Sequence, residues 1–176
     1  PDRKDCMACH NPPDYRSPGS IQLRTHDRNG SDAKGEGLWS SAVFELFNIR
    51  NAEGFHKVNG DALAGRITRD EYIREYCHAE FDAELLRSWF YRKIWLPHAV
   101  KNNLTASDWI WRVDNPATFE RFFALFTDKT RYPFVPYGAY FDGLAKHRKQ
   151  RLAYIAYVRS LNDCSSRALD RPHDSK

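Results

Sequence analysis

The stretch Thr68–Pro97, TRDEYIREYCHAEFDAELLRSWFYRKIWLP, decides the fold of this 176-residue chain. Thr68 and Glu71 form the Ser/Thr-x-x-Glu capping box that begins a helix, because each side chain can bond the other's backbone N–H. Apolar residues then recur at the three- and four-residue steps of one helical face. The pattern predicts a long helix over residues 69–96, which Pro97 ends or kinks. Its apolar face comprises Ile73, Tyr76, Cys77, Phe81, Leu85 and Trp89.

Weaker patterns surround this helix. Apolar periodicity predicts further helices over residues 38–47 and 142–161, and Asn115 followed by proline predicts the start of another. Glycines interrupt residues 51–65, so we expect short helical turns joined by bends there. Residues 131–138, RYPFVPYG, predict a proline-rich aromatic loop.

These elements predict a mostly α fold, because no pair of alternating strands joined by a hairpin turn stands out. We expect a small helical bundle over residues 38–162. It is preceded by a loop-rich arm over residues 1–37, where Pro, Gly, Ser, Asn and Asp dominate, and followed by a polar tail over residues 163–176.

Composition excludes several classes of protein. Hydrophobic residues make up 41% and charged residues 28%, so the chain can bury a core and is not disordered throughout. No apolar run approaches the roughly 18 residues that a membrane span needs. The net charge of +4 is too small for a dedicated nucleic-acid binder.

The run Cys6-Met7-Ala8-Cys9-His10 has the Cys-x-x-Cys-His spacing of covalent haem attachment. Two thiols three positions apart can each add to one of the two vinyl groups on a porphyrin edge. The adjacent imidazole can then ligate the iron as its proximal axial ligand.

On this motif, residues 6–10, the chain resembles the c-type cytochromes. The resemblance implies haem c bound through Cys6 and Cys9, with His10 as the proximal iron ligand. It also implies a monohaem electron-transfer protein with a redox partner, acting alone or as a subunit of a larger redox complex, and more an electron carrier than a catalyst. Because haem is attached in export compartments, we expect a periplasmic or otherwise exported protein.

The sixth ligand departs from the pattern of many small cytochromes c, which use a methionine further along the chain. Met7 is the single methionine here, and it lies inside the motif. His26 follows the motif on the same arm and could fold back, and His78 projects from the long predicted helix. These two are our leading candidates for the sixth ligand. The other candidates are His56, His98 and His147.

Three alternatives remain open. Zinc could stabilise a helical structural or interaction protein, since thiolate and imidazole ligands suit Zn²⁺. The cysteines could instead only staple the arm of a helical interaction module. A di-iron carboxylate site could use the two Glu-x-x-His motifs. The zinc set would be Cys6, Cys9 and Cys77 with one of His78, His10 or Cys164, and the di-iron set would be Glu53 with His56, Glu75 with His78, and Glu45 and Glu120.

Two further features lie outside the haem motif. If haem is bound, Cys77 and Cys164 remain as an even pair, for which the oxidising compartment favours a disulfide. The basic run Lys146–Arg151 is either a solvated helix face or a surface that docks an acidic redox partner.

Overall fold

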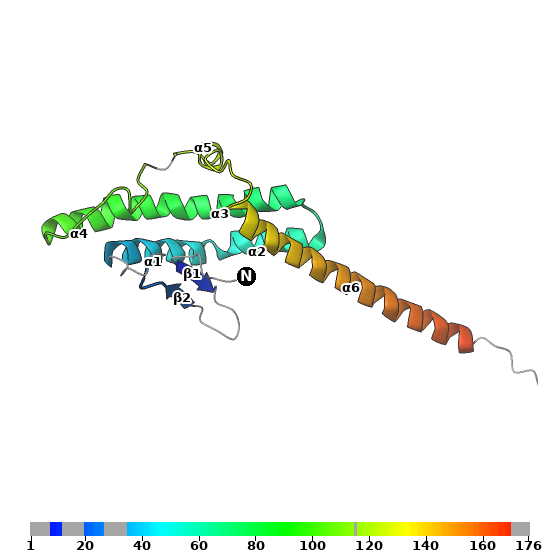
Figure 1. Cartoon of the computed structure of the whole chain (residues 1–176). Coiled ribbons are helices and arrows are strands. Elements are labelled where there is room, and N and C mark those ends of the chain that lie inside the picture. The colour runs from blue at the N-terminus through cyan, green and yellow to red at the C-terminus, as the bar shows by residue number, and fades with distance from the viewer. Residues whose placement is uncertain (1–7, 12–19, 27–34, 115, 170–176) are drawn as a thin grey trace, which may run out of the picture.

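The computed structural model describes residues 8–11, 20–26, 35–114 and 116–169, and it confirms a mostly α fold with one small sheet (Figure 1). A π-helical turn, Tyr91–Trp95, joins α3 to α4. In chain order the elements are β1 (Ala8–Asn11), β2 (Ser20–Leu23), α1 (Gly35–Arg50), α2 (Ala52–Ala64), α3 (Arg69–Phe90), α4 (Leu96–Lys101), α5 (Phe119–Phe123) and α6 (Phe134–Leu169).

Helix α3 begins as its capping box predicts. The Thr68 hydroxyl accepts a hydrogen bond from the Glu71 N–H at 3.3 Å, and the Glu71 carboxylate accepts one from the Thr68 N–H at 2.7 Å. Pro97, however, does not end the helical path, which continues through α4. The π turn lies directly before it, with the Leu96 N–H bonded to the Tyr91 carbonyl five residues back. Such a widened turn accommodates proline because the i−4 bond is already interrupted there.

Helix α2 corrects the expectation of short turns over residues 51–65. Phe55, Val58 and Ala62 form one buried stripe along a continuous helix. Gly65 ends that helix in the left-handed conformation, at φ 72°, where a side chain would be strained. Burial of the stripe therefore outweighs the conformational cost of the two glycines inside the helix.

The region before α6 corrects a second expectation. Residues 131–138 are not a loop throughout, because α6 begins at Phe134, directly after the cis peptide bond Tyr132–Pro133. The second proline of the stretch lies in the first turn of the helix, where its missing N–H costs nothing. Helix α6 continues to Leu169, beyond the predicted start of a polar tail, and its C-terminal half extends away from the body (Figure 1). The helix predicted to start at Asn115 is short by comparison, since α5 begins at Phe119 and is five residues long.

Two core clusters lie on α3. The first packs α2, α3 and the start of α6 together, and the second packs α1 against the C-terminal end of α3 and the segment 106–113. The buried members of the first are Val58, Ala62, Tyr72, Ile73, Cys77, Phe134 and Tyr137, and those of the second are Val43, Tyr91 and Trp111.

The sequence did not predict the sheet. Strands β1 and β2 pair antiparallel, with Cys9 opposite Gln22 and His10 opposite Ile21, and both strands contact α1. Four-residue strands carry too little alternation to be detected from sequence. The strands therefore attach part of the predicted arm to the helical body. None of the helices in the described part of the chain is long and apolar enough to cross a membrane.

Candidate functional site

A cavity of about 340 Å³ lies beside β1, where one strand and four helices meet. Each helix contributes residues one helical turn apart, so the cavity runs along one face of every helix that surrounds it. Its wall comprises Ala8 and Cys9 of β1, Glu45 and Asn48 of α1, Ala52, Phe55, His56 and Asn59 of α2, Tyr76 and Glu80 of α3, and Tyr137 and Tyr140 of α6.

One side of the cavity is aromatic. The Phe55 and Tyr76 ring centroids lie 4.6 Å apart, and those of Tyr76 and Tyr137 lie 4.5 Å apart. Tyr140 extends the row by stacking on Tyr137 at 6.3 Å. These rings come from three helices and are tilted against one another, by 46° for Phe55 and Tyr76 and by 42° for Tyr76 and Tyr137, so they form a contiguous apolar wall.

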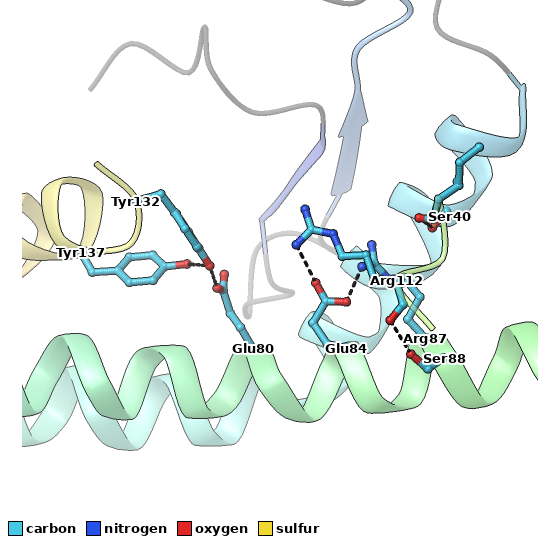
Figure 2. A network of polar contacts seen from close by, with 9 residues as sticks. Ser40, Glu80, Glu84, Arg87, Ser88, Arg112, Tyr132 and Tyr137 are labelled. Atoms are coloured by element: carbon cyan, nitrogen blue, oxygen red, sulfur yellow. Dashed lines mark hydrogen bonds and ion pairs between the residues drawn. The ribbon is translucent and has the colours of Figure 1, made fainter. Parts of the chain in front are cut away.

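The α3 side of the cavity is acidic. The Tyr132 hydroxyl donates a hydrogen bond to the Glu80 carboxylate, and the Tyr137 hydroxyl donates to the Tyr132 oxygen at 3.3 Å (Figure 2). Burial raises the pKa of Glu80 from its ordinary 4.5 to about 7, although the tyrosine hydrogen bonds act in the opposite direction. Glu80 is therefore close to half-protonated at neutral pH.

Polar groups on α1 complete the wall. Asn48 is 2% exposed, and its Nδ2 donates to Glu45 Oε2 at 3.4 Å. Within the described part of the chain, Asn48 Oδ1 accepts no hydrogen bond. Buried polar atoms are usually satisfied, so the open acceptor marks a polar position in the cavity wall.

A second buried charge cluster lies one turn further along α3. The Glu84 carboxylate lies between Arg87 and Arg112, with Arg112 Nη1 at 3.7 Å from Glu84 Oε1 (Figure 2). The Arg87 guanidinium also lies over the Phe44 ring at 5.0 Å. These residues do not line the cavity, and their charges are largely compensated by one another. We therefore assign them to the packing of α1 on α3.

The Cys-x-x-Cys-His run lies partly in this wall. Cys9 is a free thiol that donates to Gln22 Oε1 at 3.8 Å, and its side chain borders the cavity. The backbone of His10 pairs with Ile21 in the sheet, and Cys6 lies outside the described residues. Cys9 therefore places part of the Cys-x-x-Cys-His run at the cavity.

Neither leading candidate for a sixth ligand lies at the cavity. His26 is exposed, with its Nδ1 at 2.9 Å from the Thr25 hydroxyl. The exposed His78 ring packs against Phe119, with ring centroids 4.4 Å apart, on the side of α3 that meets α5. The wall instead contains His56, which the sequence offered only as one of several further histidines.

The zinc and di-iron sets are not assembled by the described residues. Across residues 8–11, 20–26, 35–114 and 116–169, no group of three or more His, Cys, Asp or Glu side chains is placed to hold a metal ion. Cys77 is 0% exposed in the core, where burial raises the pKa of its thiol. In the di-iron set, Glu120 forms an ion pair with Arg74.

The expected disulfide is not supported either. Cys77 is a free thiol inside the first core cluster, and the side chain of Cys164 lies outside the described part of the chain. Nor does comparison with known proteins add a function: no family model, no curated protein and no solved structure matches this chain. The Cys-x-x-Cys-His run and the cavity beside it are therefore the features from which a function can be inferred.

Proposed function

We propose that this chain is a monohaem c-type electron-transfer protein whose haem occupies the cavity beside Cys9. The position of Cys9 carries the proposal, since the second cysteine of a Cys-x-x-Cys-His run borders an aromatic cavity formed by four helices. When bound, the haem supplies reversible one-electron chemistry.

The residues of the wall fit such a group. Phe55, Tyr76 and Tyr137 line one side of the cavity with apolar ring surface, which would help to exclude water from a macrocycle bound there. Cys9, with Cys6, would form the thioethers, and His10 would hold the iron on its proximal side. Glu45 and Glu80 add negative charge, which favours the more positive, oxidised state of the iron and lowers its reduction potential.

Attachment requires one local change. Cys9 and His10 are consecutive residues of an extended strand in this structure. A strand turns successive residues to opposite faces, whereas haem attachment needs both residues to serve one ring. If haem is attached, we therefore expect the short β1–β2 pairing, with four residues in each strand, to be the part of the fold that changes.

A basic run on α6 suits an electron carrier that docks on a protein partner. The basic run Lys146–Arg151 belongs to α6, on the part of that helix that follows the core residues Phe141 and Leu144. A partner with an acidic surface would be attracted to this run, and the association would weaken as salt increases. We propose the periplasm or another export compartment as its location, because haem is attached there.

Expression in a periplasm equipped to attach haem c tests the proposal. We expect a Soret band and an intact mass increased by one haem. The variant Cys9→Ser lacks one of the two thioether cysteines. It should lose at least one of the two covalent links to the haem, and its reduced absorption bands should shift. Cys77→Ala is the matched control, since it removes a cysteine that does not border the cavity. It should retain the wild-type spectrum.

The opposite results would overturn the proposal. A colourless protein with the mass of the bare polypeptide would exclude haem c. Stoichiometric release of zinc from that colourless protein would instead support the zinc-stabilised alternative, in which the thiolates hold the metal.

A further inference from the structure

The histidines of the described chain differ in what their rings contact. The His78 ring packs against Phe119, and the His98 ring lies 5.8 Å from that of Trp95. His98 Nδ1 also lies 3.3 Å from the Asn102 amide nitrogen, and His26 lies against Thr25. These three imidazoles are already engaged away from the cavity.

His56 differs from these three histidines both in its position and in its contacts. It lies in the cavity wall, and within the described residues its ring takes part in no hydrogen bond, ion pair or ring contact. Its position follows from the helix: Ala52, Phe55, His56 and Asn59 stand at the i, i+3, i+4 and i+7 positions of one face of α2. Phe55 on this face is 5% exposed, so its packing helps to fix the rotation of α2 about its axis.

The other side chains in the wall that could offer a ligand atom are less suited to iron. The Glu80 carboxylate is bonded by the Tyr132 hydroxyl and is partly protonated at neutral pH. Burial raises the pKa of the Tyr76 and Tyr137 hydroxyls far above neutral, so both phenols stay protonated. An imidazole nitrogen, by contrast, is a common axial ligand of haem iron, and the His56 ring has no competing partner among the described residues.

We propose that His56 is the second axial ligand of the haem, which makes the iron bis-histidine with both axial positions filled. This inference rests on the function proposed above. A filled sixth position directs the site to electron transfer and leaves no coordination position at which a small molecule could bind or react.

The test compares haem-loaded wild-type protein with His56→Ala. Wild type should show the sharp reduced bands of six-coordinate, low-spin iron and should not bind carbon monoxide. The variant should show a high-spin spectrum, bind carbon monoxide when reduced, and regain the low-spin spectrum when imidazole is added. His56 is exposed, and alanine is the better helix former, so circular dichroism should show an intact fold.

A replacement and two controls sharpen the result. His56→Met should restore six-coordinate iron with a higher reduction potential, because His/Met ligation raises the potential. His78→Ala and His147→Ala remove exposed histidines that do not border the cavity, and both should keep the wild-type spectrum.

The outcomes separate this inference from the function on which it rests. Protein without covalent haem would overturn the proposed function. Covalent haem with a spectrum that His56→Ala leaves unchanged would overturn the role of His56 alone. A change to high spin in His78→Ala instead would assign the ligand to His78.

Discussion

At the scale of single residues, the environment of Glu80 makes the stability of the fold depend on pH. Its carboxylate is half-buried beside the cavity with two tyrosine hydroxyls but no basic partner among the residues that shift its pKa, which rises to about 7. The folded protein therefore binds more protons than the unfolded chain between about pH 4.5 and pH 7, so stability falls as pH rises through that window. At 1.36 kcal/mol per unit, the loss from this group is about 3 kcal/mol.

Glu80→Gln tests this prediction. Urea unfolding at a series of pH values should show that the variant lacks this loss of stability between pH 4.5 and pH 7, because glutamine does not titrate. Glu75→Gln is the control, an exposed glutamate on the same helix, and it should follow the wild-type curve. Parallel curves for wild type and Glu80→Gln would show that Glu80 is ionised normally in the folded state.

At the scale of elements, the start of α3 depends on its capping box, and the chain contains a natural control. The Thr68 side chain accepts a hydrogen bond from the Glu71 N–H, whereas Thr118, at the corresponding position of α5, makes no side-chain cap bond. We expect Thr68→Ala to lower the free energy of unfolding by about 1 kcal/mol.

Thr118→Ala should change that free energy by less than half as much, because no cap bond is lost there. Chemical denaturation of both variants measures the difference. Equal effects of the two substitutions would mean that the capping box does not contribute to stability.

The elements also show what the sequence could predict. Helix α3 was predictable because its cap and its apolar face agree over six turns. Helix α2 was not, since its glycines conceal a helix that is stabilised by packing rather than by propensity. The start of α6 was hidden by two prolines, one after a cis bond and one in the first helical turn.

The cavity could not be predicted for a different reason. Its wall combines residues from four helices and a four-residue strand, and no local pattern specifies which faces of separate helices meet. The sequence therefore identified Cys9 by its motif, but it favoured His26 and His78 over His56. The position of His56 in the wall follows from the rotation of α2 about its axis, to which the packing of Phe55 contributes.

At the scale of the whole molecule, α6 has two halves with different roles. Its first turns belong to the core, where Phe134 is 6% exposed, whereas Leu152 and Tyr154 further along are 59% and 67% exposed. The outer half extends from the body (Figure 1). Since burial of apolar surface is the main stabilising contribution to a fold, the outer half should contribute little to the stability of the body.

A truncation tests this division. A chain ending after Arg151 should lose helical circular dichroism but shift its thermal midpoint by less than about 2 °C, which corresponds to under about 1 kcal/mol for a chain of this size. Phe134→Ala, in the inner half, should cost about 3–5 kcal/mol because it opens a cavity in the first core cluster. If the truncation lowers the midpoint as much as Phe134→Ala does, the outer half packs on the body in solution. If it does not, the outer half does not pack on the body, and the basic run of α6, which lies before the truncation point, stays available to an acidic partner. A partner that contacts the basic run alone should bind the truncated chain as it binds the full chain. A partner that also contacts the exposed apolar residues beyond Arg151 should bind the truncated chain more weakly.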